Sequence, residues 1–121
     1  MILVDSCGWI EFLADGDKAE EYSKYLLDTK EIATPTIVIY EVFKKVLQER
    51  GEEAAVMVAA QMSGTRVIEL SETLSLTAAN LSIKHSLPMA DAIVYATAEL
   101  LGCQVVTSDK HFKDLKNVIF I

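Results

Sequence analysis

The sequence predicts an α/β domain in which helices cover both faces of a mainly parallel central sheet of four to five strands. Two observations lead to this fold class. Short apolar runs, which are typical of strands, alternate along the chain with longer segments whose apolar residues recur every three or four positions. In addition, the run at residues 2–4 is apolar without interruption, as expected for a strand that is buried on both faces of a parallel sheet.

The first strand and the first helix meet at a pair of polar residues. The run at residues 2–4 ends at Asp5, and both Asp5 and Ser6 suit the N-cap of a helix that extends to Leu13. The residues Asp-Gly-Asp at 15–17 then interrupt the helical pattern. We therefore expect a strand and a helix that share a boundary at Asp5.

A helix, a short strand and a longer helix come next. Apolar spacing indicates a helix over about residues 18–28, and the run at residues 32–33 indicates a second strand. Pro35 suits the start of a helix that extends to Arg50, where Gly51 stops it. Five apolar residues follow one side of this helix at helical spacing: Ile39, Val42, Phe43, Val46 and Leu47.

The middle of the chain holds two further helices and a third strand. The helix at residues 52–62 is apolar almost all round, so we expect it to be buried in the domain or at a subunit interface. Residues 67–68, together with Leu70, form the expected third strand. Ser71 opens a helix that extends to Leu87 and has apolar residues at six positions: Leu74, Leu76, Ala78, Ala79, Leu81 and Ile83.

The last part of the chain places two acids at element boundaries. Pro88 opens a helix that carries Asp91 in its first turn and stops at Gly102. The apolar run at residues 104–107 follows as a strand and leads directly to Asp109. A final strand is expected at residues 118–121, and the absence of a linker or repeat indicates one domain over residues 1–121.

The composition argues against several classes of protein. Hydrophobic residues make up 51% of the 121 residues, which is typical of a chain with a compact core and not of a disordered one. A net charge of −7 provides no basic field for nucleic acid, which argues against a DNA-binding module but not against a nuclease whose metal ions offset its carboxylates. Two cysteines are too few for a disulfide framework or a zinc site, and we expect both to be reduced.

No segment of the sequence predicts contact with a membrane. The N-terminus lacks the basic region of a signal peptide. No apolar run approaches the ~20 residues that a transmembrane helix needs. We therefore expect a soluble, cytoplasmic protein.

Two strands end in a similar set of residues. An apolar run leads to Asp5-Ser6 in the first strand and to Thr107-Ser108-Asp109 in the later one. Equivalent ends of parallel strands lie along one edge of a sheet, and ligands bind in the crevice outside that edge. Asp5 and Asp109 therefore lie near each other if their strands are close in the sheet. Each also has a simpler interpretation as a helix N-cap, worth about 1 kcal/mol.

Two more acids are candidates for the same place. Asp91 lies in the first turn of its helix, where a carboxylate also complements the helix dipole. Glu41 is harder to place, because a helical wheel sets it opposite the apolar stripe and Lys45 offers it an ordinary surface ion pair. The first turn of that helix is apolar all round, which favours burial, but periodicity alone leaves Glu41 at the surface.

Convergence of these acids would require a counter-ion. Like charges at close range raise each other's pKa or recruit a cation. A cluster of oxygen ligands without His or Cys selects the hard metals Mg²⁺ or Mn²⁺. The chemistry that such a cluster suits is phosphodiester hydrolysis, in which metal ions activate water and stabilise the leaving oxygen.

Four short segments, at residues 3–6, 36–42, 87–98 and 106–112, resemble the PIN-domain ribonucleases, most closely the VapC-type toxins of type II toxin–antitoxin pairs. The four occur in order and span nearly the whole chain. The resemblance implies a PIN-like α/β/α sandwich and an endoribonuclease that depends on Mg²⁺ or Mn²⁺. It also implies a homodimer and a cognate antitoxin that blocks the cleft.

The same resemblance assigns residues to the site. By position, the acidic metal-binding quartet of the family corresponds to Asp5, Glu41, Asp91 and Asp109. Thr107 matches the hydroxyl residue beside the fourth acid, and Ser6 is a candidate helper by adjacency alone. The resemblance moves Glu41 from the surface to the metal site. Ser108 departs from many relatives, which carry a larger polar or basic residue there, and this bears on substrate contacts if that residue touches RNA.

Three other functions remain as alternatives. One is a PIN-domain nuclease in housekeeping RNA processing, and another is a binding module that keeps the fold but has lost activity. The third is a phospho-accepting receiver domain, which also uses strand-end acids and Mg²⁺. The strand before Pro35 ends without an acid, which argues against the receiver domain.

Basic residues near these acids also allow two interpretations. His85 and His111 could form an acid–base pair for metal-free cleavage of RNA. We instead expect His111 and Phe112 to pack the loop behind Asp109, or His111 to lie at the rim of the cleft. Six cationic residues could hold RNA phosphates or simply form solvated faces: Lys44, Lys45, Arg50, Lys110, Lys113 and Lys116.

Overall fold

A five-stranded parallel sheet forms the centre of the computed structural model, which describes residues 1–121. The strands lie in the order β3-β2-β1-β4-β5, and every neighbouring pair is parallel. Their bounds are β1 (Ile2–Val4), β2 (Ile32–Pro35), β3 (Arg66–Ile68), β4 (Gln104–Thr107) and β5 (Val118–Phe120). This order differs from the 2-1-3-4-5 order of receiver domains, so that alternative is wrong.

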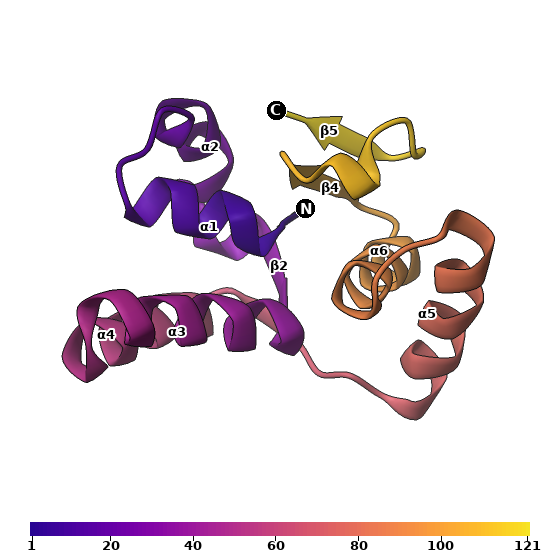
Figure 1. Cartoon of the computed structure of the whole chain (residues 1–121), viewed down its shortest axis with the longest axis horizontal. Helices are drawn as coiled ribbons and strands as arrows, with labels where there is room; N and C mark the ends of the chain where they lie inside the picture. The colour runs from indigo at the N-terminus through magenta and orange to yellow at the C-terminus, as the bar shows by residue number, and fades with distance from the viewer.

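Six α-helices cover the two faces of the sheet. They are α1 (Ser6–Leu13), α2 (Ala19–Leu26), α3 (Thr36–Arg50), α4 (Glu52–Ser63), α5 (Glu72–His85) and α6 (Met89–Leu101). Figure 1 shows α1 to α4 on one side of the strands and α5 with α6 on the other. Right-handed crossovers require this arrangement, because the chain moves outward from β1 to β3 and then returns past β1 to reach β4. The predicted α/β/α sandwich is confirmed.

Several element ends differ from the sequence prediction by one or two residues, and β3 ends at Ile68 without the expected Leu70. Strand β2 extends two residues further, to Pro35, whose φ of −63° and ψ of 146° serve both the strand end and the N-cap of α3. Helix α5 ends at His85 and not at Leu87, because Ser86 adopts a left-handed conformation with φ 55° and caps the helix. All of these changes concern helix or strand ends and leave the order of the elements as predicted.

Helix α5 exposes three residues that we expected on its apolar side, Leu76, Ala79 and Ile83. It packs against α6 through Leu74, Ala78 and Leu81, which are buried at helical spacing. Leu76 and Ile83 lie on the other side and are 63% and 85% exposed. An outer helix with one partner buries one narrow face, so the additional apolar residues point to solvent.

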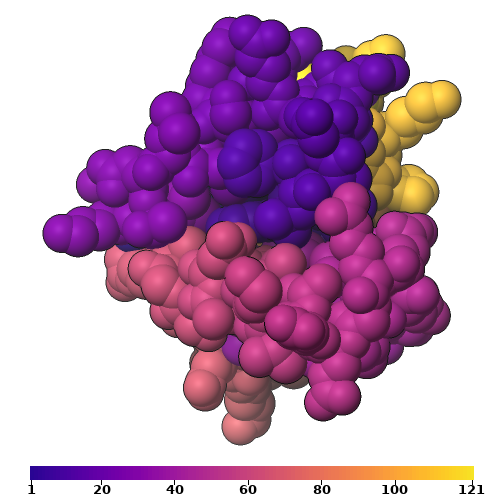
Figure 2. Space-filling model, turned by 90° about the vertical axis from the view of Figure 1, so that its left-hand side faces the viewer, coloured from indigo at the N-terminus to yellow at the C-terminus, as the bar shows by residue number.

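Helix α4 was expected to be buried in the domain or at a subunit interface. The domain buries only one side of it. Ala55 and Met62 are fully buried, whereas Val56 and Met57 are 54% and 62% exposed. Figure 2 shows the face of the molecule on which α3 and α4 lie below α1 and α2. The exposed apolar side of α4 is therefore available for contact with another protein.

Helix α6 and the central strands form the core beneath the carboxyl edge of the sheet. Residues 92–98 of α6 are buried without a break, and they pack beside β4, whose Val105 and Val106 are fully buried. This burial fixes the first turn of α6 against the ends of the central strands. No helix in the structure is both long and apolar enough to cross a membrane.

Candidate metal centre

The candidate site lies at the carboxyl edge of the sheet, between β1 and β4. These strands pair in parallel with Val4 opposite Val106, and the backbone N–H of Asp5 extends the pairing by donating to the Val106 carbonyl at 3.0 Å. The strand order reverses direction between β1 and β4, which makes this the point where α/β sheets open a crevice for ligands. Asp5 and Asp109 were expected to lie near each other if their strands were close in the sheet. Because β1 and β4 are direct neighbours, this condition is met.

Asp5 is an N-cap and also faces the crevice. One carboxylate oxygen accepts a hydrogen bond of 2.8 Å from the Ser6 backbone N–H, and the other accepts one of 2.9 Å from the Thr107 hydroxyl. The side chain is only 3% exposed. Burial raises the pKa of Asp5 above 3.8, and repulsion from Asp109 adds to this, while the hydrogen bonds from Thr107 and Ser6 oppose it. The N-cap interpretation is correct, but it accounts for only one of the two oxygens.

Asp109 and Asp91 both contact one nitrogen of the His111 imidazole ring. Asp109 caps the short 3₁₀ helix η2 (Lys110–Phe112), where its Oδ1 accepts from the His111 backbone N–H at 2.9 Å. The same Oδ1 lies 2.9 Å from His111 Nδ1, and Asp91 Oδ2 also lies 2.9 Å from that nitrogen. The histidine thus joins the first turn of α6 to the end of β4.

Glu41 faces the other acids and does not pair with Lys45. Lys45 instead forms an ion pair with Glu49 at 2.9 Å, so the expected surface pair with Glu41 is wrong. Helix α3 buries Val38 and Val42 most deeply, and Glu41 lies between these two in sequence, beside the buried face. Burial raises the pKa of Glu41, and repulsion from Asp5 and Asp109 adds to this, while the Ser6 side chain opposes it.

Asp91 shows how closely the charges are gathered. Burial raises its pKa to about 6, and repulsion from Asp109, Asp5 and Glu41 contributes, while attraction to His111 opposes the change. All three other acids therefore raise the pKa of Asp91 through space. The structure brings together all four acids that the resemblance selected.

Three further side chains lie beside this cluster, and the sequence indicated such a place only for His111, as one of two alternatives. His111 was expected behind Asp109 or at the rim of the cleft, and its half-exposed imidazole lies at the rim of the cluster, with Nδ1 2.9 Å from both Asp109 Oδ1 and Asp91 Oδ2. Cys7 Sγ lies 3.4 Å from the Thr107 hydroxyl, and Tyr22 hydrogen-bonds Ser108 through its hydroxyl. The sequence signal for His111 was its position two residues after Asp109. A single 3₁₀ turn at this point brings the His111 side chain back to the Asp109 carboxylate.

The donor set of the cluster fits a divalent cation. Ligand atoms of Asp91, Asp109 and His111 all lie within 4.8 Å of one another. Buried carboxylates with raised pKa values gain from a cation that neutralises them, and carboxylate oxygens are the usual ligands of Mg²⁺ and Mn²⁺. The arrangement is therefore suited to holding a metal ion at the edge of the sheet.

The sequence itself matches a known family over almost its full length. A family model described as the PIN domain matches residues 2–118. The chain belongs to the PIN-domain family. A comparison with curated protein sequences finds no match for this PIN domain.

Solved structures share the fold of this PIN domain. A toxin–antitoxin complex from Klebsiella pneumoniae gives a TM-score of 0.83 at 22% identity, covering 98% of this chain and 96% of that one. The Mycobacterium tuberculosis VapC20, described as a sarcin–ricin loop cleaving toxin, gives 0.79 at 21% identity, with 98% and 97% covered. VapBC2 from Rickettsia felis, bound to a fragment of promoter DNA, gives 0.74 at 18% identity, with 100% and 98% covered.

Proposed function

We propose that this PIN-domain protein is an endoribonuclease that depends on Mg²⁺ or Mn²⁺ and acts as the toxin of a type II toxin–antitoxin pair. The observation that carries the proposal is the convergence of four acids from distant parts of the chain on the β1–β4 crevice: Asp5, Glu41, Asp91 and Asp109. Such a cluster is costly without a cation, because burial and repulsion both oppose its ionisation.

The four acids would hold the metal, and neighbouring groups would orient them. A bound divalent ion supplies an activated water and stabilises the leaving oxygen of a phosphodiester. Thr107 fixes Asp5 by its hydrogen bond of 2.9 Å, and Ser6 lies close enough to affect both Asp5 and Glu41. These contacts support Thr107 and Ser6 as residues that position the carboxylates.

A hollow beside Glu41 supports RNA as the substrate. It has a volume of about 260 Å³ and is lined by Tyr40, Glu41, Lys44, Lys45 and Gln48. Tyr40 is 51% exposed, and Lys44 Nζ lies 5.7 Å from the centre of its ring. Exposed aromatic rings stack on unpaired bases and lysines neutralise phosphates, so one strand of RNA can be held next to the acids.

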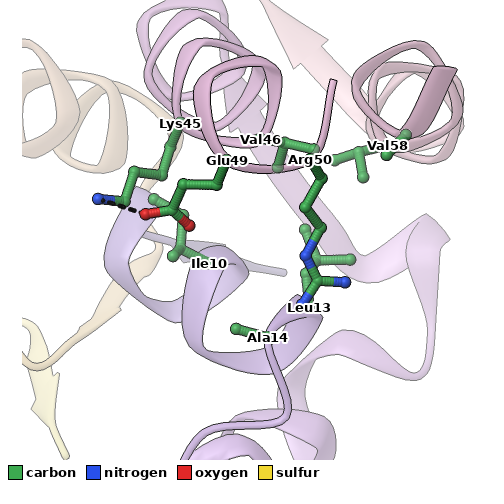
Figure 3. A pocket seen from close by; sticks show the side chains of 9 residues that line it. Ile10, Leu13, Ala14, Lys45, Val46, Glu49, Arg50 and Val58 are labelled. Atoms are coloured by element: carbon green, nitrogen blue, oxygen red, sulfur yellow. Dashed lines mark ion pairs between the residues drawn. The ribbon is translucent and has the colours of Figure 1, made fainter. Parts of the chain in front are cut away.

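The structural relatives support a protein inhibitor as the partner. Several of them are complexes of a VapC toxin with its antitoxin or are described as toxins. A groove between α1 and the α3–α4 pair offers a surface for such a partner, lined by Ile10, Leu13, Ala14, Lys45, Val46, Glu49, Arg50, Ala54 and Val58. Figure 3 shows its apolar floor flanked by the Lys45–Glu49 pair on one side and Arg50 on the other. Val56 and Met57 are exposed on α4, the helix that also contributes Ala54 and Val58 to the groove. Their apolar side chains could contact an antitoxin or a second copy of this chain.

RNA cleavage in the presence of Mg²⁺ or Mn²⁺ tests the enzymatic proposal. We expect Asp5→Asn and Asp91→Asn each to lower the cleavage rate by about 100-fold or more, since each removes a charge that the metal needs. Asp17→Asn, in the exposed loop before α2, is the matched control and should cleave as the wild type does. Equal rates for the wild type and both site variants would contradict the metal-site assignment.

The toxin assignment needs its own test, because a housekeeping PIN nuclease would share the site. We expect the short protein encoded beside this one to co-purify with it and to abolish cleavage at equimolar ratio. Growth arrest on expression of the wild type, and its absence for Asp91→Asn, should accompany this. Cleavage of RNA without growth arrest or an inhibitory neighbour would favour the housekeeping alternative.

A further inference from the structure

The His111 imidazole contacts two of the four acids through one nitrogen. Its Nδ1 is 2.9 Å from Asp91 Oδ2 and 2.9 Å from Asp109 Oδ1. Adjacent ligands of an octahedral ion with metal–ligand distances of about 2.1 Å are themselves about 3 Å apart. The nitrogen is therefore spaced from the two oxygens as neighbouring ligands of a six-coordinate ion are spaced.

The backbone holds the imidazole in this place. The Asp109 side chain accepts from the His111 backbone N–H at 2.9 Å, and the Phe112 N–H donates to the Asp109 carbonyl at 3.0 Å. Phe112 is fully buried and anchors the turn to the core. The His111 side chain itself remains 54% exposed, so a cation arriving from solvent can reach the nitrogen and the two oxygens together.

We propose that His111 is a nitrogen ligand of the cation held by Asp91 and Asp109, and that it makes the site prefer Mn²⁺ to Mg²⁺. This inference rests on the metal site of the proposed function and extends it to the choice of ion. Imidazole nitrogen is a good ligand for transition-metal ions, whereas Mg²⁺ prefers oxygen and keeps its waters. His111 adds a nitrogen to a donor set that otherwise consists of carboxylate oxygens.

A different behaviour follows if His111 only supplies positive charge to the two acids. In that case the imidazole competes with any cation, and its removal would tighten the binding of both ions. A ligand behaves in the opposite way, because its removal weakens Mn²⁺ binding and leaves Mg²⁺ binding almost unchanged. The sign of the change therefore separates the two cases.

The test is titration calorimetry with Mn²⁺ alone and Mg²⁺ alone on the wild type, His111→Ala, Asp91→Asn and the matched control His85→Ala. His85 is the only other histidine, and its ring packs edge-on against Tyr95 at 5.7 Å. We expect His111→Ala to raise the Kd for Mn²⁺ by about tenfold or more and the Kd for Mg²⁺ by less than about threefold. His85→Ala should match the wild type, and Asp91→Asn should lose affinity for both ions.

Pulsed EPR on the Mn²⁺-loaded protein provides a direct second readout. We expect a ¹⁴N coupling in the wild type and in His85→Ala, and its loss in His111→Ala. Binding of Mn²⁺ that depends on Asp91 but is unchanged or tighter in His111→Ala overturns this inference and leaves the proposed function intact. Failure of the wild type to bind either ion overturns both.

Discussion

The hydroxyl group of Thr107, at the end of β4, donates a hydrogen bond of 2.9 Å to Asp5, at the end of β1. The two residues are 102 positions apart in the sequence, and both are buried, at 0% and 3% exposure. The same hydroxyl accepts a hydrogen bond of 3.0 Å from the backbone N–H of Asp109. One side chain thus fixes the relative positions of the first and the last acid of the cluster.

Replacement of Thr107 by valine tests this link. Thr107→Val keeps the shape but leaves the Asp5 oxygen and the Asp109 N–H without their partner, at a cost of about 1–3 kcal/mol in the free energy of unfolding. We expect cleavage to fall as well, because Asp5 loses a hydrogen bond that favours its ionised form. Urea denaturation and cleavage rates measure the two effects.

Two variants control for this substitution. Thr107→Ser keeps the hydroxyl and should retain most of the activity. Thr97→Val removes another buried hydroxyl, one that donates to the Ile93 carbonyl within α6, and should leave cleavage close to that of the wild type. Full activity in Thr107→Val would show that Asp5 does not need this hydrogen bond.

Asp91 makes the stability of the metal-free protein depend on pH. Its pKa is about 6 in the folded protein and 3.8 ordinarily, so between these values the folded state binds more protons than the unfolded state. The free energy of unfolding should therefore fall as the pH rises from about 4 to about 6, by on the order of 1–2 kcal/mol. Burial raises the pKa of Asp5 and Glu41 too, which adds to the change in the same direction.

Asp91→Asn isolates this contribution. In the presence of a chelator we expect the variant to be more stable than the wild type at pH 7 and to show a weaker pH dependence below pH 6. Urea denaturation at pH 4.5 and pH 7 provides the comparison, with Asp17→Asn as the control that keeps the wild-type dependence. The same pH dependence in the wild type and Asp91→Asn would contradict the raised pKa.

The hollow next to Glu41 predicts a defect in RNA binding that leaves the chemistry intact. Tyr40→Ala combined with Lys44→Ala should raise KM about tenfold or more with a smaller effect on kcat, because a stacking surface and a phosphate contact are lost. Lys84→Ala, on α5 across the sheet, is the control for charge alone. Equal KM values for the double variant and Lys84→Ala would show that RNA does not bind in this hollow.

The exposed side of α4 predicts a protein contact. Met57→Glu should weaken antitoxin binding or reduce the solution mass of the free protein, since a charge would enter an apolar interface. Ile83→Glu, at an apolar residue that is 85% exposed on α5, is the matched control and should change neither. Light scattering and antitoxin titration distinguish a second copy from an antitoxin. Unchanged values in both measurements would exclude α4 from either contact.

Most of the fold could be predicted because its elements have strong local patterns. The uninterrupted apolar runs of β1 and β4, the proline before α6 and the glycine after it all lie where the sequence indicated. Helix α3 was predicted too, and its deeply buried side was predicted in part. Val42 of the predicted stripe is fully buried, and so is Val38, which was not in the stripe. Ile39 and Val46 pack against the core while half-buried, and Leu47 is 41% exposed.

The sequence by itself determined the alternation of strands and helices, and it placed Asp5, Asp91 and Asp109 at element ends, because capping and apolar spacing are local properties of the chain. The family resemblance had assigned Glu41 to the same site, but the local pattern had not, and the tertiary structure brings both Glu41 and His111 to the other acids. The orientation of Glu41 depends on which side of α3 meets the rest of the domain, and that of His111 depends on where α6 lies beside β4. Both are consequences of packing between segments far apart in sequence, which no local pattern records.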